Sequence, residues 1–319
     1  TGASDCYNWY TNFYNGSAGE YPCRSTNTYG YNICNSDTET YYVRVRRSTG
    51  SASCDTYTIR FANNPSTSGP DCSHSTPCDS PTTLTLNSTR SDTLVGEQDD
   101  FSGSCGGGSG PDKLFKFTLS STRDVFISAF STAFDPVIYL ATTCGGSTYC
   151  NDDAYSTVQS SVLILGSLPA GTYYLVVDSA GSSGGAFSLE TYANANYAAG
   201  GSCGQPVRLL NGYNSSGSTC GYSNTVTPYC AYYTTQEDRV YYFIKETSGT
   251  VTANTCYYTY DTVVEFRNTC NTGYLTCNDD ACGSSQGGQV SYSFSPGVYF
   301  FIVEGYSSCQ TYLPYVSGL

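Results

Sequence analysis

The sequence predicts an all-β protein made of tandem, disulfide-rich β-sandwiches of jelly-roll or immunoglobulin-like type, the first of them incomplete. The first observation is that the apolar segments are short, rich in Val, Tyr, Phe, Ile and Thr, and separated by clusters of Gly, Ser, Asn and Pro, as in strands joined by turns. The second is a repeat, because the stretch from Asp112 to Tyr174 recurs 126 residues later. The third is a content of 17 cysteines with a single histidine.

Four motifs keep nearly the same spacing in the two copies, which indicates a duplicated folding unit. They pair Asp112-Lys-Leu-Phe with Asp238-Arg-Val-Tyr, Phe134-Asp-Pro-Val with Tyr260-Asp-Thr-Val, Cys150-Asn-Asp-Asp with Cys277-Asn-Asp-Asp, and Gly171-Thr-Tyr-Tyr with Gly297-Val-Tyr-Phe. Each copy opens on a Cys-x-x-Pro motif, at Cys78 and at Cys203. We therefore expect one sandwich over 78–193 and another over 203–319, joined by a linker over 194–202.

Six strands are expected in each complete copy, and no convincing helix. In the first they span Leu114–Leu119, Val125–Phe130, Val137–Thr142, Ser161–Leu168, Thr172–Asp178 and Ala186–Tyr192. In the second they span Val240–Lys245, Thr250–Cys256, Thr262–Arg267, Val290–Ser295, Val298–Glu304 and Thr311–Val316. Partial alternation of large and polar side chains favours antiparallel sheets with one buried face, and this number of short strands favours a sandwich.

The first 63 residues match only the second half of a copy. Thr40-Tyr-Tyr-Val resembles Thr172-Tyr-Tyr-Leu, and Cys54-Asp-Thr-Tyr resembles Cys309-Gln-Thr-Tyr. We predict a partial sandwich over 1–63, followed by a Pro- and Ser-rich linker over 64–77. Half a sandwich leaves sheet edges open and an apolar face exposed, and strands from a second copy of the chain would cover both. Such a head-to-tail contact does not close on itself and generates a filament.

Charge and hydropathy exclude nucleic acid and a membrane span. Lys and Arg total 13 against 26 Asp and Glu, so the net charge of −13 would repel a phosphate backbone. No run of 18 apolar residues is present, so no segment is expected to span a bilayer. Because methionine is absent, we expect a mature or trimmed chain.

The cysteines indicate disulfide bonds and an extracellular location, since there is no Cys-x-x-Cys pair and His74 stands alone. Equivalent cysteines of the two copies should pair equivalently. The expected pairs are Cys6–Cys23, Cys34–Cys54, Cys78–Cys105, Cys144–Cys150, Cys203–Cys230, Cys220–Cys309, Cys256–Cys282 and Cys270–Cys277. Cys72 is left over, either as a free thiol or as a link between subunits.

We expect no catalytic site. A nucleophilic triad needs a base, and His74 lies in the linker outside both copies. Adjacent carboxylates such as Asp152 and Asp153 do not straddle a sugar ring as glycosidase chemistry requires. Clustered oxygen ligands make calcium a possible cofactor, and the alternative is that these side chains cap turns without an ion. The candidate ligands are Asp135, Asn151, Asp152 and Asp153 in one copy and Asp261, Asn278, Asp279 and Asp280 in the other.

Sugars and aromatic side chains supply the remaining candidates. Asn15, Asn87 and Asn214 begin glycosylation sequons in expected loops. Most of the 32 tyrosines are expected to pack in cores or across strands. An aromatic cluster in the incomplete unit is interpreted as a docking interface, with stacking on sugars as the alternative. Its residues are Tyr7, Trp9, Tyr10, Phe13 and Tyr14.

Several of these motifs together resemble the bacterial pre-peptidase C-terminal domain. They are Asp100-Phe-Ser-Gly-Ser-Cys, Phe134-Asp-Pro-Val-Ile-Tyr-Leu, Cys144-Gly-Gly, Cys150-Asn-Asp-Asp and Leu168-Pro-Ala-Gly-Thr-Tyr-Tyr. The resemblance implies a secreted, non-catalytic sandwich with a jelly-roll-like core, of the kind found beside exported peptidases, which sometimes binds calcium or extracellular polymers. It covers 78–193 well, 203–319 moderately and 1–63 partly.

The tandem architecture with an incomplete terminal unit also resembles the subunits of extracellular microbial fibrils built by strand exchange. Two functions follow from these resemblances. The first is a structural subunit that assembles with itself head to tail, with glycans attached or bound. The alternative is a polysaccharide- or matrix-binding accessory module cleaved from a larger exported enzyme.

Overall fold

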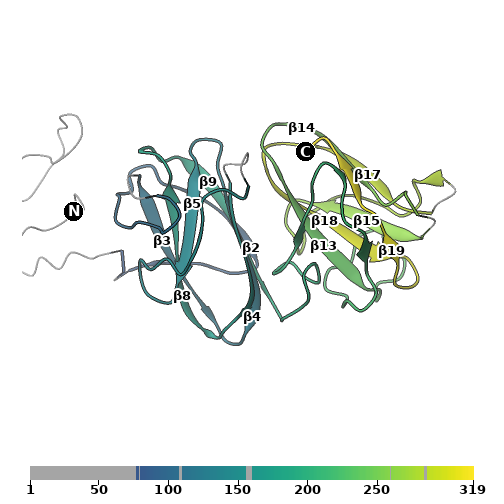
Figure 1. The fold of residues 1–319 in the computed structure, drawn as a ribbon, viewed down its shortest axis with the longest axis horizontal. Coiled ribbons are helices and arrows are strands. Elements are labelled where there is room, and N and C mark those ends of the chain that lie inside the picture. Colours follow the sequence, from purple (N-terminus) through teal and green to yellow (C-terminus); the bar gives the residue numbers. More distant parts are fainter. Residues whose placement is uncertain (1–76, 79, 108–109, 156–159, 259, 284–285) are drawn as a thin grey trace, which may run out of the picture. The chain divides into compact units, whose positions relative to one another are not determined.

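The computed structural model describes residues 77–319, apart from 79, 108–109, 156–159, 259 and 284–285 (Figure 1). Two compact units are distinguished, Thr1–Ser80 and Pro81–Leu319, and the account below concerns the second. Its elements are all strands, which confirms the all-β, disulfide-rich class. The predictions for the partial sandwich and its linker concern residues outside the described part of the chain. These include Asn15, the aromatic cluster from Tyr7 to Tyr14, the cysteines up to Cys72, and His74.

The first sandwich consists of two sheets (Figure 1). One has the order β1 (Thr82–Thr83), β3 (Asp112–Leu119), β8 (Gly171–Ser179), β5 (Pro136–Ala141) and β6 (Tyr149–Asn151). The other has the order β2 (Ser88–Thr93), β9 (Ala186–Asn194), β4 (Arg123–Phe130) and β7 (Ser161–Leu168). All neighbours are antiparallel except β1 and β3.

The second sandwich repeats this topology. Its five-stranded sheet has the order β10 (Val207–Arg208), β13 (Asp238–Lys245), β18 (Gly297–Gly305), β15 (Thr262–Arg267) and β16 (Tyr274–Asn278). The four-stranded sheet has the order β11 (Gly212–Tyr213), β20 (Tyr315–Ser317), β14 (Gly249–Asn254) and β17 (Gln289–Phe294). A further pair joins β12 (Gly217–Ser218) to β19 (Thr311–Tyr312). The matching strand orders show that the sequence repeat is a repeat of folding units.

In the second copy the strands β10, β11, β12 and β16 were not expected, and one expected strand is divided in two. The stretch expected as one strand over Thr311–Val316 forms β19 and β20, separated by Leu313 and Pro314. Proline has no backbone N–H to donate to a ladder, so it ends one strand before the next begins. The carbonyl oxygen of Pro314 still accepts a hydrogen bond from Asn214 N (2.9 Å).

Each sandwich has its own apolar core between its sheets. The first contains Phe115, Ile127, Leu140, Leu175 and Leu189, all fully or almost fully buried. The second contains a group of aromatic rings, Tyr241, Phe243, Phe266, Phe294 and Phe301. Within it the Phe243 and Phe294 centroids lie 5.3 Å apart with their planes at 88°, the edge-to-face geometry that aromatic pairs favour.

A third apolar cluster contains residues of both sandwiches. Alternate residues of β4 face opposite sides, so Ile127 joins the first core while Phe126 joins this shared cluster. The Phe126 ring lies 5.3 Å from Tyr242 of β13 and 5.8 Å from Phe300 of β18. Tyr192 of β9 accepts a hydrogen bond from the backbone of Cys270 (2.9 Å). Strand β4 is therefore buried on both faces.

The disulfide bonds require a correction. The structure joins Cys105 to Cys150, Cys230 to Cys277, Cys203 to Cys270, Cys220 to Cys309, and Cys256 to Cys282. Cys78 and Cys144, at the positions equivalent to Cys203 and Cys270, are disulfide-bonded as well. The expected Cys220–Cys309 and Cys256–Cys282 pairs are thus present. The expected Cys78–Cys105, Cys144–Cys150, Cys203–Cys230 and Cys270–Cys277 pairs are wrong.

Hairpin geometry explains the error. Two residues of a hairpin are neighbours only where they lie opposite each other. Cys150 of β6 lies opposite Tyr139 of β5, whereas Cys144 lies in the turn beyond β5, and Cys277 likewise lies opposite Glu265. The loop that carries Cys105 crosses this edge and reaches Cys150 instead. The expectation that equivalent cysteines pair equivalently holds, although the partners differ.

Candidate functional site

Exposed tyrosines distinguish the second sandwich from the first. Ten tyrosines are exposed among the described residues, and nine of them follow residue 207. The nine are Tyr213, Tyr229, Tyr232, Tyr233, Tyr257, Tyr258, Tyr260, Tyr274 and Tyr292, and the first sandwich has only Tyr149. The expectation that tyrosines mostly fill cores overlooked this surface.

Six tyrosines lie on three loops at one end of the second sandwich and are called the tyrosine surface here. They are Tyr232, Tyr233, Tyr257, Tyr258, Tyr260 and Tyr306. Strand register brings their loops together, because the first residue of β13 pairs with Glu304 of β18 and the first residue of β15 pairs with Gly305. The Tyr306 N–H also donates to the carbonyl oxygen of Asp261 (3.1 Å).

The rings of the tyrosine surface contact one another in two groups. Tyr232 lies 4.9 Å from Tyr233 and 6.5 Å from Tyr306, with the planes of Tyr232 and Tyr306 only 24° apart. Tyr258 lies 4.9 Å from Tyr257 and 5.8 Å from Tyr260. Five of the six side chains are exposed, from 36% for Tyr258 to 73% for Tyr232, and Tyr306 is half-buried. Clusters of exposed aromatic rings are frequent at binding surfaces.

The first sandwich shows that its fold does not need these rings. Its loop from Cys105 to Asp112 is Gly-Gly-Gly-Ser-Gly-Pro, where the second sandwich has Ala-Tyr-Tyr-Thr-Thr-Gln-Glu. The positions of Tyr257 and Tyr258 are Ser131 and Thr132, and that of Tyr306 is Ala180. The position of Tyr260 is Phe134, so the same topology forms with small side chains at all of these positions except that one.

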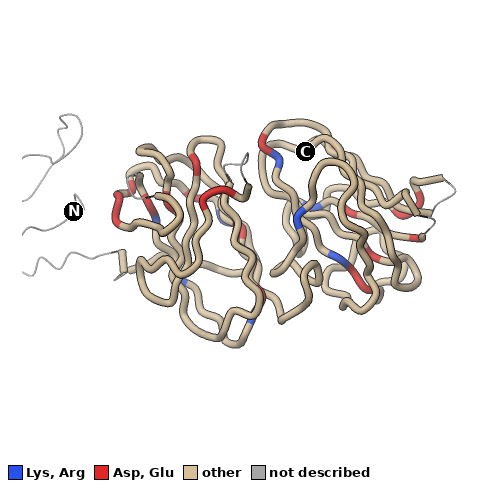
Figure 2. The backbone as a smooth tube through the Cα atoms, viewed as in Figure 1, with Lys and Arg blue, Asp and Glu red and all other residues tan. Residues whose placement is uncertain are grey.

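Acidic side chains border the tyrosine surface. Burial and the charges of Asp280 and Asp279 raise the pKa of Asp261 above its ordinary value. Desolvation and the charges of Asp279 and Asp261 raise the pKa of the Tyr306 hydroxyl. Lys and Arg, blue in Figure 2, are few and scattered over the described chain. The surface thus offers hydrogen-bond acceptors and negative charge beside aromatic rings.

The predicted calcium ligands are partly engaged by the backbone. Asn151 accepts a hydrogen bond from Val162 N (2.7 Å) and donates to the carbonyl oxygen of Asp153 (3.0 Å), and Asn278 accepts from Gln289 N (3.3 Å). Only the bond from Asn151 to Asp153 is local. The two bonds that the amide oxygens accept come from residues eleven positions further along the chain, so they join neighbouring segments.

The acidic members do lie near one another in each copy. Burial and the charges of Asp152 and Asp153 raise the pKa of Asp135 to about 6. No three His, Cys, Asp or Glu side chains within the described ranges converge as a metal site would need. Calcium binding therefore stays a prediction.

Two equivalent buried carboxylates, which the sequence marked only as repeat positions, hold loops in place. Asp112 Oδ2 accepts hydrogen bonds from the backbone of Asp100 and Phe101 (both 2.7 Å). Asp238 Oδ2 accepts from Thr225 N (2.5 Å) and Val226 N (2.9 Å). Burial raises the pKa of Asp112 to about 7 and that of Asp238 to about 6. In both carboxylates the Oδ2 atom accepts from two backbone N–H groups, so these contacts hold the loops in place.

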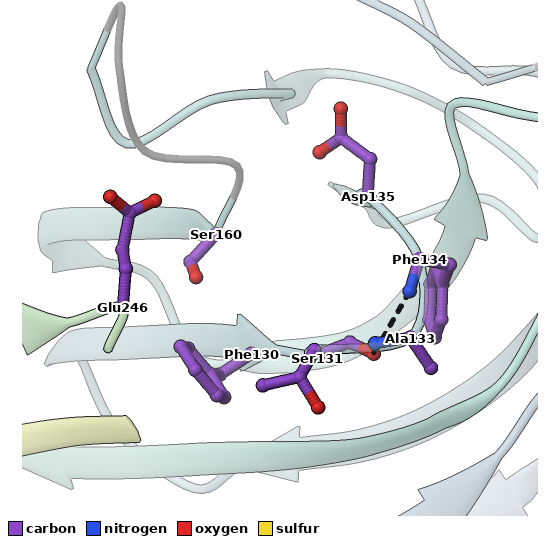
Figure 3. A pocket seen from close by; sticks show the side chains of 8 residues that line it. Phe130, Ser131, Ala133, Phe134, Asp135, Ser160 and Glu246 are labelled. Carbon is purple, nitrogen blue, oxygen red and sulfur yellow. Dashed lines mark hydrogen bonds between the residues drawn. The ribbon is translucent and has the colours of Figure 1, made fainter. Parts of the chain in front are cut away.

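A hollow of about 420 Å³ lies beside Asp135 and Glu246. In Figure 3, Asp135 and Glu246 face it from different sides, next to Ser160. Ser131 accepts hydrogen bonds from two backbone N–H groups of the adjoining turn (3.0 and 3.3 Å). The hollow has carboxylates but no histidine, lysine or cysteine among its lining residues, so the general base of a nucleophilic triad is not found there.

The side-chain amides of the two described sequons, Asn87 and Asn214, form different hydrogen bonds. Asn87 is exposed, and its Oδ1 accepts a hydrogen bond from Ala193 N (2.9 Å). The Asn214 Nδ2 donates to the carbonyl oxygens of Leu210 (3.0 Å) and Gly212 (3.3 Å). A glycan on Asn214 would have to displace at least one of these bonds, because it replaces one of the two hydrogens on the same nitrogen.

No family model matches the chain, and no curated protein sequence matches it. Among solved structures, it is similar to the pre-peptidase C-terminal domain of a Bacillus anthracis collagenase, with 16% identity and a TM-score of 0.26 over 35% of this chain and 93% of that chain. A Paenibacillus xanthan lyase matches with 13% identity and a TM-score of 0.20 over 67% of this chain and 23% of the lyase. Likenesses at this level concern the β fold alone, and they give no support to the resemblance to fibril subunits.

The described residues contain no helix that is long and apolar enough to cross a bilayer.

Proposed function

We propose that the chain is a secreted, non-catalytic module that binds a neutral polysaccharide through the tyrosine surface. The single observation that carries this is the contrast between the repeats: two sandwiches share a topology, and only one covers its loops with exposed tyrosines. Secretion is supported by the disulfide bonds, in which all 12 cysteines of the described residues take part. It corresponds to the accessory module that the sequence offered as the alternative, and not to the fibril subunit that was expected first.

The chemistry of the tyrosine surface favours a sugar as ligand. The face of an aromatic ring carries the negative part of its quadrupole, which attracts the C–H groups on the face of a sugar ring. Phenol hydroxyls and the carboxylates of Asp279 and Asp280 can exchange hydrogen bonds with sugar hydroxyls. The same carboxylates repel acidic sugars, because like charges across an interface oppose binding. A neutral polymer therefore fits best.

The test replaces the two tyrosines of the loop after Cys230 with glycine, the residue that prevails in the equivalent loop of the first sandwich. Tyr232→Gly combined with Tyr233→Gly is measured against cellulose, chitin and mannan by sedimentation with the insoluble polymer, alongside Tyr292→Ser as a matched control on strand β17. We expect each ring to account for about a tenfold change in the dissociation constant, about 1.4 kcal/mol. The control should bind as the unchanged protein does.

Two outcomes would overturn the proposal. One is that the unchanged protein binds none of the three polymers, and the other is that the double variant binds as well as the control. Release of reducing ends during incubation would instead identify a hydrolase. A change in binding without such release is the expected result.

The filament interpretation remains a separate prediction, because it depends on residues 1–63. Micrographs of the purified protein test it directly. Long uniform filaments would support head-to-tail assembly, whereas dispersed particles that bind a polymer would support the module alone.

A further inference from the structure

We propose that Tyr229 and Tyr274 form a site of oxidative cross-linking, at which the two rings join as dityrosine. Their centroids lie 4.6 Å apart with an angle of 39° between the planes. Tyr229 is 77% exposed and Tyr274 is 47% exposed, so an oxidant in solution reaches both. They are the closest pair of exposed tyrosine rings among the described residues.

The backbone holds the two rings on different segments that are tied together. Tyr229 precedes Cys230, which is joined to Cys277 by a disulfide with a Cα–Cα distance of 5.9 Å. The Cys230 N–H also donates to the Cys277 sulfur (3.2 Å), and the Tyr229 N–H donates to Glu265. Tyr274 lies in β16, opposite Arg267 of β15. Rings held at this distance react as an intramolecular pair, with a far higher effective concentration than two free phenols.

The first sandwich shows that the pair is not needed to close the loop. Its equivalent residues, one before Cys105 and three before Cys150, are Ser104 and Ser147. Their hydroxyl oxygens lie 3.0 Å apart and share a hydrogen bond. The two positions therefore meet in both repeats, as serines in one and as oxidisable phenols in the other.

Few other side chains would compete for a one-electron oxidant. The chain has no methionine and a single tryptophan, Trp9, among its 319 residues. The described cysteines are all in disulfides, so none offers a thiol on the oxidation ladder. Tyrosine is the dominant oxidisable side chain of this protein.

The reaction balances with hydrogen peroxide as oxidant and a haem peroxidase as catalyst. Each phenol loses one electron and one proton to give a tyrosyl radical. The radicals couple through ring carbons next to the hydroxyls, and both rings regain aromaticity as the hydrogens on those carbons move to the oxygens. Peroxide takes up the two electrons and two protons and becomes two molecules of water. The product is a carbon–carbon bond that thiols do not reduce.

The experiment treats the full protein with hydrogen peroxide and a haem peroxidase, then reduces and alkylates the disulfides before digestion. We expect mass spectrometry to find peptides containing Tyr229 and Tyr274 still joined, lighter than their sum by two hydrogen atoms. The yield should not depend on protein concentration. Tyr274→Phe should abolish this product, because it keeps the ring but lacks the phenol, while Tyr292→Phe should retain it.

Three results would overturn the inference. They are the absence of the joined peptides from the unchanged protein, an equal yield in Tyr274→Phe, and a yield that rises with protein concentration. The residues involved are not those of the tyrosine surface, so failure of polysaccharide binding would leave this inference standing.

Discussion

Three buried carboxyl groups, Asp112, Asp238 and Glu304, contribute to how the folded chain responds to pH, in the same direction as Glu190, whose pKa burial also raises. Burial raises the pKa values of these three groups to about 7, about 6 and about 8. Ordinary values in an unfolded chain are about 4. Between these limits the folded state binds more protons than the unfolded state, so the free energy of unfolding falls as pH rises from about 4 to about 8. We predict that the protein is more stable at pH 5 than at pH 8.

Denaturant titrations at several pH values measure how steeply the free energy of unfolding changes with pH. Glu304→Gln should flatten this slope, because both carboxylate oxygens of Glu304 are buried without a hydrogen-bond partner among the described residues and an amide does not titrate. Asp99→Asn, at an exposed position, is the control and should leave the slope unchanged. A stability that rises between pH 5 and pH 8 would contradict the prediction.

Among the elements, strand β4 gives the sharpest test of packing. Its burial is nearly continuous, and Ile127 is fully buried in the first core between the sheets. We predict that Ile127→Ala lowers the free energy of unfolding by about 2–5 kcal/mol, because it removes buried methyl groups and leaves a cavity. Val95→Ala, at a residue 71% exposed, is the matched control. If Ile127→Ala lowered the free energy of unfolding no more than Val95→Ala does, this face of β4 would not be packed.

Apolar alternation predicts the central strands well and the edge strands poorly. The expected strand Thr172–Asp178 lies within the central strand β8, and Thr262–Arg267 agrees with the central strand β15. Of the edge strands, β7 agrees with the expected Ser161–Leu168. Strand β2 has the sequence Ser-Thr-Arg-Ser-Asp-Thr and was not expected. An edge strand of this kind is held by its backbone ladder to β9, so its side chains carry no apolar signal.

One loop of the tyrosine surface could have been found from the repeat alone. Comparing the loop after Cys105 with the loop after Cys230 shows glycines in one copy and tyrosines in the other. The convergence of that loop with Tyr257 and Tyr306 could not be predicted, because it depends on the register of β13, β15 and β18. Four disulfide pairs were predicted wrongly for the same reason, because strand register, and not distance along the sequence, decides which residues of a sheet are neighbours.

At the scale of the whole molecule, the shared cluster should make the two sandwiches unfold together. Phe126 of the first sandwich is fully buried against Tyr242 and Phe300 of the second. We predict that β8 and β18 lose protection from hydrogen exchange at the same urea concentration in the unchanged protein, with its disulfides intact. Phe126→Ala should remove about 3–5 kcal/mol of packing and separate the two midpoints.

Ile127→Ala distinguishes coupling from general destabilisation, because Ile127 faces the first core and leaves the shared cluster intact. It should lower both midpoints while keeping them together, whereas Phe126→Ala should drive them apart. Separate midpoints in the unchanged protein would contradict the prediction. The sandwiches would then unfold as independent units. In that case the free energy gained by burying Phe126 would be smaller than the entropic gain of unfolding one sandwich alone.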